Sequence, residues 1–257
     1  METLQAPEGD VLIEHRATYF NRVLAVLFLI APGLLVAALS TQLNSADADA
    51  RGPILVFAAV LVGLGALGIV QQNKVKAVLR ADGLERWGLR GKLWALRWAE
   101  MAELRYRVLK IRVYHVIPAG TYIRLSFTDP NGKKRKLPLN IKGIEMLSER
   151  VIEQQTTARF PEARAKIDAG EEVAFGKIRI DKDKVSARKL FGGTKACPLA
   201  EIEKVSVDGG VLRIRQKGKM FAFASLMVGS VPNVFLFLRL LGSMQPAAQA
   251  PPRADVA

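Results

Sequence analysis

The chain has 257 residues, half of them hydrophobic, and a formal net charge of +14. It contains one cysteine, Cys197, and two histidines, His15 and His115, which excludes an internal disulfide and leaves no spacing typical of a zinc site. Residues 1–70 carry three basic and six acidic side chains, whereas residues 71–257 carry 35 and 18. A region so basic is expected to meet an anionic partner, either nucleic acid or the anionic face of a membrane.

Two uncharged apolar runs follow an N-terminal segment, residues 1–22, that we expect to be cytosolic. They cover residues 23–43 and 53–70, which is 21 and 18 residues. Because an α-helix rises 1.5 Å per residue, about 20 apolar residues span the hydrocarbon core of a bilayer. The runs therefore predict a transmembrane hairpin over residues 23–72. The alternative is a pair of buried core helices, which are seldom free of charge on every face.

The charges around the two runs predict the orientation of the hairpin. The loop of residues 44–52 carries one basic residue, Arg51. The outer flanks carry five: Arg16, Arg22, Lys74, Lys76 and Arg80. Lys and Arg accumulate on the cytoplasmic side of short flanks. We therefore expect a multi-pass protein of the cell membrane with both termini in the cytoplasm.

Small residues in the two runs predict how the helices pack. Gly33 and Ala37 are four positions apart, as are Ala59 and Gly63, and such pairs let transmembrane helices approach closely. Residues 63–68 also match the dinucleotide-binding pattern G-x-G-x-x-G. That fingerprint requires the glycines in a turn after a strand, and here they lie inside an uncharged run, so no nucleotide site is predicted.

The sequence after the hairpin repeats at an offset of 101 residues. Residues 81–104 align without a gap onto residues 182–205, with six identities among the 23 positions from 82 to 104. Each copy has alternating apolar segments, a turn, further alternating segments and a final helical pattern. Alternation is typical of half-buried strands. The pattern predicts two copies of one unit, each with several antiparallel strands and one C-terminal helix.

The predicted fold class is therefore α+β, with a transmembrane hairpin followed by tandem domains. The first domain is predicted at residues 73–159 and the second at 175–243. A linker, residues 160–174, separates them, and residues 244–257 form a disordered tail. In the first domain, TDPNG at 128–132 predicts a hairpin turn.

The second domain leaves one alternative open. Residues 220–238 are 19 positions without a charge, so a third transmembrane helix is possible on length. Pro232 and Asn233 interrupt this run, and Arg239 follows it at once. The repeat instead predicts a strand followed by a buried helix.

Four segments carry a resemblance to a known group of proteins. They are DGL at 82–84, RWAEM at 97–101, FGKIRID at 175–181 and VPNVFLFLRLL at 231–241. With the two N-terminal spans, they resemble uncharacterised bacterial membrane proteins that have pleckstrin-homology-like (PH-like) domains. The resemblance covers residues 20–243. It implies a PH-like fold and a membrane location, and it carries no catalytic residues or cofactor.

Two basic groups are the candidate contacts with an anionic surface. The first follows the Asn-Gly turn and the second alternates along a predicted strand: Lys133, Lys134, Arg135 and Lys136, then Arg213, Arg215, Lys217 and Lys219. Basic residues near a membrane are attracted to the anionic inner leaflet. The alternative reading is a solvated strand edge. Trp94, two positions from Lys92, is a candidate for the bilayer interface. No basic helix or RNA-binding signature favours nucleic acid as a partner.

No catalytic motif is present, and we predict no catalytic, cofactor-binding or metal-binding residues. Glu100 and Glu201 recur at one equivalent point of the repeat, which favours a capping or hairpin role over acid–base chemistry. We expect a non-enzymatic, membrane-anchored protein that docks an anionic lipid surface or a protein partner. One alternative is a regulatory subunit that joins a larger membrane complex through its transmembrane hairpin. The other is an enzyme with an unrecognised site.

Overall fold

The computed structural model describes residues 9–16, 26–41, 48–88, 90–113, 117–137, 141–188 and 192–244. Over these ranges the protein is a mixed α+β structure with four α-helices and several antiparallel sheets. The chain divides into two compact units. Unit 1 comprises residues 1–95 and 140–144, and unit 2 comprises residues 96–139 and 145–257.

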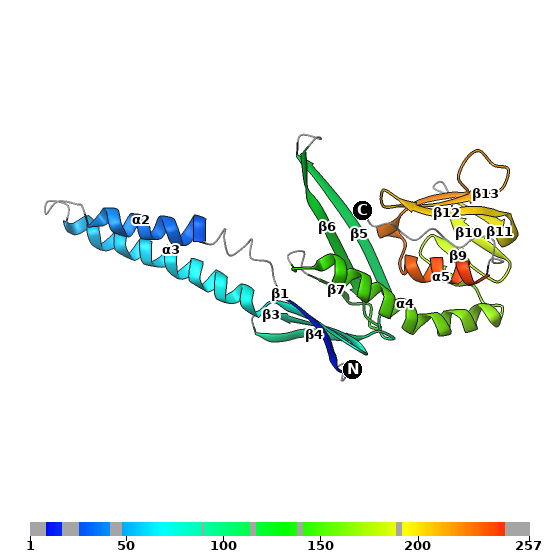
Figure 1. Ribbon diagram of the computed structural model, residues 1–257, viewed down its shortest axis with the longest axis horizontal. Helices are drawn as coiled ribbons and strands as arrows, with labels where there is room; N and C mark the ends of the chain where they lie inside the picture. The colour runs from blue at the N-terminus through cyan, green and yellow to red at the C-terminus, as the bar shows by residue number, and fades with distance from the viewer. Residues whose placement is uncertain are drawn as a thin grey trace. The chain divides into compact units, whose positions relative to one another are not determined.

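Unit 1 contains two apolar helices that lie side by side (Figure 1). The first is a π-helical segment, η1 (Val26–Ile30), continued by α2 (Ala31–Ser40), and the second is α3 (Ala48–Lys74). Within the described ranges, only α3 is long and apolar enough to cross a membrane, over Gly52–Val70. The sequence predicts two spans, but η1 and α2 together cover only 15 described residues. Positions 23–25, 42 and 43 of the first predicted span lie outside the described residues.

The sheet of unit 1 contains an N-terminal strand that sequence analysis placed outside the first domain. The strands are β1 (Val11–Arg16), β2 (Lys76–Arg80), β3 (Gly83–Gly88) and β4 (Gly91–Arg97), in the order β1-β2-β3-β4. Strand β1 pairs antiparallel with β2, although both apolar helices lie between them in the chain. No local pattern reveals such a partner, because the two strands are about 60 residues apart.

Unit 2 begins with a second sheet of order β5-β6-β7. Its strands are β5 (Glu103–Val113), β6 (Ile117–Thr128) and β7 (Lys134–Lys136). The turn between β6 and β7 is the one that TDPNG predicts. The Asp129 N–H donates to the Lys133 carbonyl (3.1 Å), and Gly132 has a φ of +77°, which glycine adopts without strain.

Helix α4 (Ile144–Asp168) follows this sheet and continues without interruption past Pro161. Its last turns therefore occupy residues 160–168, inside the segment that the sequence suggests as a linker. Ala163 and Ile167 of this part are buried in the core of the sheets that follow. The predicted N-cap of the helix, Asn140, lies outside the described residues.

The rest of unit 2 repeats the order of four strands, three strands and a helix. The four-stranded sheet contains β8 (Val173–Phe175), β9 (Ile178–Ile180), β10 (Lys184–Arg188) and β11 (Thr194–Pro198). After η3 (Leu199–Glu201) come β12 (Ile202–Asp208), β13 (Val211–Gln216) and β14 (Ala224–Met227), then η4 (Val228–Ser230) and α5 (Val234–Met244). We call β1–β7 with α4 the first copy, and β8–β14 with α5 the second copy.

The second copy has one continuous apolar core. Phe175 of β8 and Phe237 of α5 meet edge to face with ring centroids 5.5 Å apart, and both are fully buried. Leu212 and Ile214 of β13 join the same core. Strands β3 and β10 begin 101 residues apart, as the sequence alignment requires.

The alternative of a third transmembrane span over residues 220–238 is wrong. Residues 220–238 are divided between a loop, β14, η4 and the start of α5, whose apolar side chains face the core. Asn233, at a φ of +50°, interrupts the run because it binds strand β5. Its N–H donates to the Leu104 carbonyl (2.7 Å), its Oδ1 accepts from the Leu104 N–H (2.7 Å), and its Nδ2 donates to the Ala102 carbonyl (2.9 Å).

Candidate functional site

The point where the apolar helices leave and re-enter the sheet is the first candidate site. Arg16, the last residue of β1, lies opposite Lys76, the first residue of β2, and Lys76 lies opposite Trp87 of β3. Helix α3 ends at Lys74, so only one residue separates it from β2. The Lys76 Nζ also lies 3.0 Å from Glu14 Oε2. This end of the sheet therefore has the Lys76 side chain and the Trp87 ring close to the end of α3.

Trp87 is held between two lysines at this end of the sheet. The Nζ of Lys76 lies 5.4 Å from its ring centroid, and the Nζ of Lys92 lies 5.7 Å away. Cations at these distances are attracted to the face of the ring. Trp94, the tryptophan predicted for the bilayer interface, is instead buried. The position of Trp87 depends on strand pairing, which the local sequence does not reveal.

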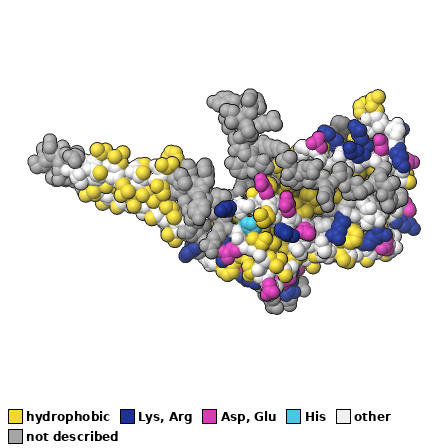
Figure 2. Space-filling model, viewed as in Figure 1, with side chains coloured by type: hydrophobic (Ala, Val, Ile, Leu, Met, Phe, Trp, Pro, Cys, Tyr) yellow, Lys and Arg dark blue, Asp and Glu magenta, His cyan; other side chains and the backbone are white. Residues whose placement is uncertain are grey.

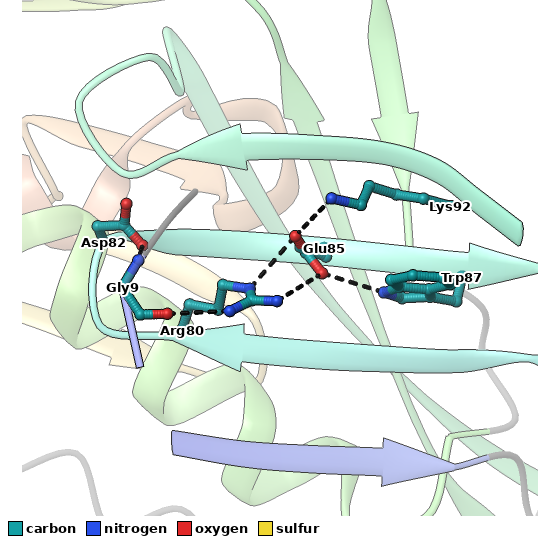
Figure 3. A network of polar contacts seen from close by, with 6 residues as sticks. All are labelled: Gly9, Arg80, Asp82, Glu85, Trp87 and Lys92. Atoms are coloured by element: carbon teal, nitrogen blue, oxygen red, sulfur yellow. Dashed lines mark hydrogen bonds and ion pairs between the residues drawn. The ribbon is translucent and has the colours of Figure 1, made fainter. Parts of the chain in front are cut away.

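A buried carboxylate, Glu85, organises the surrounding side chains (Figure 3). The Lys92 Nζ donates to its Oε1 (2.9 Å), the Trp87 Nε1 donates to its Oε2 (3.1 Å), and the Arg80 Nε lies 3.2 Å from Oε1. Burial by itself raises the pKa of Glu85, but the hydrogen bonds from Lys92, Trp87 and Arg80 outweigh it and lower the pKa below its ordinary value. Glu85 is thus held ionised.

The same network reaches the residues before β1. The Arg80 Nη1 donates to the Gly9 carbonyl (3.0 Å), and the Gly9 N–H donates to Asp82 Oδ1 (2.9 Å). Arg80 therefore connects Glu85 of β3 to the chain that enters β1 (Figure 3). Because Glu85 is buried and accepts from Lys92, Trp87 and Arg80, the arrangement suits a structural brace better than a catalytic group. The brace holds the sheet that carries both ends of the helix pair.

The contact between α2 and α3 uses some of the predicted small residues. Gly33 is buried, and a Cβ at this position would lie 2.9 Å from Val62 Cγ2 and 3.1 Å from the Ala58 carbonyl oxygen. Gly65 is buried too, and a Cβ there would lie 2.5 Å from Ile30 Cγ1. The α3 side of the interface therefore follows Ala58 and Gly65, which are seven residues apart.

The other predicted packing residues lie elsewhere. Ala59 and Gly63 are exposed, and a Cβ on Gly63 would meet nothing within 4 Å. Ala37 is half-buried. The contact on α3 thus involves Ala58 and Gly65 and not the predicted pair of Ala59 and Gly63, because several small residues in this helix offer alternative faces.

The first basic group is divided between two sides of β7. Lys133, Lys134 and Lys136 are exposed, whereas Arg135 is half-buried. The Arg135 Nη2 lies 3.2 Å from Asp129 Oδ2, and Asp129 is buried. Arg135 therefore neutralises a buried carboxylate, and only the three lysines project into solvent.

The second basic group lies together on one side of the second copy. Arg213 and Arg215 are exposed on β13, where they alternate with the buried core residues. Lys217 and Lys219 are exposed in the loop that follows. Arg213 lies 3.6 Å from Asp208 Oδ2 in an exposed ion pair, which contributes little to stability. The alternation predicted from the sequence thus places these residues on one exposed face and its loop.

The remaining polar candidates have structural roles. The Glu100 carboxylate accepts from the Arg97 N–H (3.3 Å), and the Glu201 carboxylate accepts from Gln216 Nε2 (2.6 Å), so both brace turns. Cys197 is buried, which raises the pKa of its thiol. The described part of the chain holds no group of three or more His, Cys, Asp or Glu side chains that could bind a metal. His115 lies outside the described residues.

Comparison with known proteins places the chain in a family. A family of unknown function, DUF6585, matches residues 5–250. The chain belongs to this family. The match includes the N-terminal strand, both apolar helices and both copies of the repeat. No curated protein matches the sequence.

Proposed function

We propose that this DUF6585 protein is a non-enzymatic membrane protein that uses two basic PH-like modules to dock an anionic lipid surface or a protein partner. Its two apolar helices cross the bilayer as a hairpin, and both modules lie on the cytoplasmic side. The residue types around the candidate site favour binding over chemistry, since Glu85 and Asp129, the buried carboxylates among the described residues, both pair with neighbouring basic side chains.

The observation that carries the proposal is the pairing of Arg16 with Lys76. These residues belong to one sheet, so they lie on the same side of any membrane. A single crossing by α3 would put them on opposite sides. The chain must therefore cross again between residues 16 and 48, and residues 23–43 are the one uncharged run of sufficient length there.

The surface of the two helices supports a lipid environment. Only 11% of the Gly52–Val70 stretch is buried, so α3 does not have the surroundings of a core helix. Large apolar side chains such as Phe28, Leu35 and Val56 are at least 60% exposed. Figure 2 shows hydrophobic side chains covering this part of the molecule. An uninterrupted apolar surface of this kind is costly in water and favourable in lipid.

The element order supports the PH-like assignment. Four antiparallel strands, three antiparallel strands and a C-terminal helix occur in both copies. In the second copy, α5 packs on the core with Val234, Phe237 and Leu241 buried. This agrees with the expectation from sequence of strands closed by a terminal helix. The exposed lysines and arginines of both copies supply the positive surface for an anionic partner.

Topology is tested by labelling single introduced cysteines with a membrane-impermeant maleimide. Asp49→Cys lies at the start of α3, on the predicted outer side, and Thr194→Cys is exposed in the second copy. We expect intact cells to label Asp49→Cys only, with Thr194→Cys labelled after the cell membrane is opened. The native Cys197 gives little background because it is buried. Equal labelling of both sites in intact cells would contradict the hairpin.

Docking is tested with the full chain in nanodiscs of neutral lipid. The nanodiscs are floated with protein-free vesicles of phosphatidylcholine, with or without about one third phosphatidylglycerol. We expect flotation with the anionic vesicles only, weakening as salt rises. The variant Lys133→Gln, Lys134→Gln and Lys136→Gln leaves Arg135 on Asp129 and should float less. Equal flotation with neutral vesicles would exclude the anionic surface as the ligand.

One observation favours the second candidate, a regulatory subunit of a larger membrane complex. Ala59 and Gly63 form a small-residue face on α3 that the contact with α2 leaves exposed. Such faces let another transmembrane helix approach closely. This candidate predicts that a membrane partner co-purifies in mild detergent and is lost when Ala59 and Gly63 are both replaced by Leu.

A further inference from the structure

The loop between β13 and β14 exposes two large apolar side chains that sequence analysis did not single out. Met220 is 87% exposed and Phe221 is 82% exposed. No other large hydrophobic side chain in the described part of the chain is as exposed, including those on the apolar helices. In Figure 2, hydrophobic side chains project at the upper right, where Figure 1 places the loop that follows β13.

The fold holds this loop at its first end. The Lys217 N–H donates to the Glu201 carbonyl (2.8 Å), and Gln216 Nε2 donates to the Glu201 carboxylate (2.6 Å). The Lys219 N–H returns to the Gln216 carbonyl (3.2 Å) across Gly218, whose φ of +68° permits the tight turn. The chain is therefore directed away from the sheet at a defined point.

The loop is held at its second end by the core. Phe223, two residues after Phe221, is 7% exposed, and the Nζ of Lys195 lies 4.8 Å from its ring centroid. Ala224 is also buried and pairs with Ile214 in the sheet. Because the core accepts Phe223 but leaves Phe221 in solvent, the exposure of Phe221 follows from the fold and not from a lack of apolar surroundings nearby.

Positive charge surrounds the two apolar side chains. Residues 211–224 contain four basic and no acidic residues. All four, Arg213, Arg215, Lys217 and Lys219, are exposed. Three acidic residues lie near this face: Glu201 accepts from Gln216, Asp208 lies 3.6 Å from Arg213, and Glu203 is exposed on β12. The tip of the loop, Met220 and Phe221, is thus apolar, and the residues that lead to it are cationic.

The corresponding loop of the first copy lacks this combination. Between β6 and β7, residues 129–133 form a tight turn closed on the buried Asp129, with no large apolar side chain. Basic residues follow that turn as well, so positive charge is common to both loops. The apolar tip is specific to the second copy.

We propose that the loop Lys217–Phe221 enters the anionic bilayer interface, with Met220 and Phe221 among the acyl chains and the basic residues on the lipid phosphates. Apolar side chains with a basic border are the combination by which peripheral segments bind anionic membranes. A lipid surface matches both features at once, since its apolar layer lies directly beneath its negative charge. The inference rests on the proposed membrane anchor, which keeps the second copy close to a bilayer.

The test uses the full chain in nanodiscs with an environment-sensitive fluorophore on Met220→Cys. A matched control carries the fluorophore on Thr194→Cys. Thr194 is exposed at the start of β11, whereas Glu201 follows the end of that strand. Nanodiscs contain phosphatidylcholine alone or with phosphatidylglycerol. Lipids with a quencher on a shallow acyl carbon report the depth of the label.

In anionic nanodiscs we expect the emission of the label at position 220 to shift to the blue and to be quenched at least twofold. The label at position 194 should show neither change. Both changes at position 220 should be lost when Arg215, Lys217 and Lys219 are changed to Gln. An unquenched label at position 220 in anionic nanodiscs would overturn the inference. The inference would also be overturned if Met220→Cys were protected from labelling in cells but not in nanodiscs, because that result would indicate a protein partner. The labelling test of the hairpin is independent, so the loop can fail while the anchor stands.

Discussion

The two copies of the repeat have the same order of elements but are stabilised differently at equivalent positions. Glu85 of the first copy corresponds to Ser186, and Lys92 corresponds to Gly193. The first copy therefore has a buried, charged brace where the second has small residues over an apolar core. The first copy carries the helix pair between its first two strands, and its brace joins the same strands. The strands that flank the insertion are thus tied to β3 by ion pairs and hydrogen bonds.

The two copies also carry separate natural reporters. All three tryptophans, Trp87, Trp94 and Trp98, belong to the first copy, and the single cysteine, Cys197, is buried in the second. Tryptophan fluorescence therefore follows the first copy, and the rate of Cys197 labelling follows opening of the second. Both signals can be read from the full chain in nanodiscs, so the comparison can be tested within one molecule.

The largest expected effect, on sedimentation with membranes, comes from removing the helix pair that distinguishes the first copy. Arg16 lies opposite Lys76, so an Asn-Gly turn can replace residues 17–75 and join β1 to β2 as an ordinary hairpin. We expect this variant to stay in the supernatant after ultracentrifugation without detergent, with the circular dichroism of a folded, strand-rich protein. The full chain should sediment with membranes. A variant that folds only in detergent would show that the helices belong to the core.

The next effect should be confined to the second copy. Phe237→Ala removes a fully buried ring from the contact with Phe175 and should lower the free energy of opening by about 3–5 kcal/mol. Cys197 labelling should accelerate accordingly. Phe235→Ala is the matched control, since Phe235 is only partly buried and should cost less. If the tryptophan signal melts together with Cys197 exposure, the two copies unfold as one.

A smaller effect should be confined to the first copy. Glu85→Gln leaves Arg80 and Lys92 without their carboxylate, and we expect a loss of about 2–3 kcal/mol in the tryptophan-detected free energy of unfolding. Ser186→Ala, at the equivalent position, should change the Cys197 signal little.

The same variant has a predicted pH dependence. Because the pKa of Glu85 is lowered in the folded state, its contribution is complete above the ordinary value of 4.5 and is lost as the pH falls through the lower folded pKa. The wild-type first copy should therefore lose more stability than Glu85→Gln on acidification below pH 4.5, measured by tryptophan fluorescence. Parallel pH profiles would show that the brace contributes nothing.

The smallest effect should come from the helix pair itself. A Cβ at Gly33 would press on the Ala58 backbone, so Gly33→Ala should destabilise the pair by about 1–2 kcal/mol, seen as a lower thermal midpoint in mild detergent. Gly63→Ala meets open space and should leave the midpoint unchanged or raise it. An equal loss in both variants would place the contact on the face that the sequence suggested.

Local patterns in the sequence were sufficient for many of the elements. Alternation identified the strands around the Asp turns, TDPNG identified the β6–β7 turn, and the offset of 101 residues located β10 from β3. The alternation and the turn lie within a few residues, and the repeat is a direct comparison of two stretches of sequence, so none of these signals requires knowledge of the tertiary structure. The alternation of Arg213 and Arg215 likewise placed them on one exposed face.

The features that sequence analysis missed depend on partners distant in the chain. Strand β1 forms by pairing with β2, and the conformation of Asn233 is held by its hydrogen bonds to Leu104. Arg135 lies in a basic run of the sequence, but its side chain forms an ion pair with Asp129. Met220 and Phe221 belong to the uncharged run 220–238, for which the sequence offered a third span or a strand followed by a buried helix. The pairing of Ala224 with Ile214 shows that the strand begins only after these two residues.

The pairing of β1 with β2 has a consequence for how the protein is made. The first strand leaves the ribosome about 60 residues before its partner, and in the proposed topology the chain between them enters the bilayer meanwhile. If the helices insert with the wrong number of crossings, the two strands end on opposite sides and β2 keeps an open edge. Open edges invite aggregation. In the proposed topology, the complete sheet can therefore form only in a chain that has inserted with both crossings.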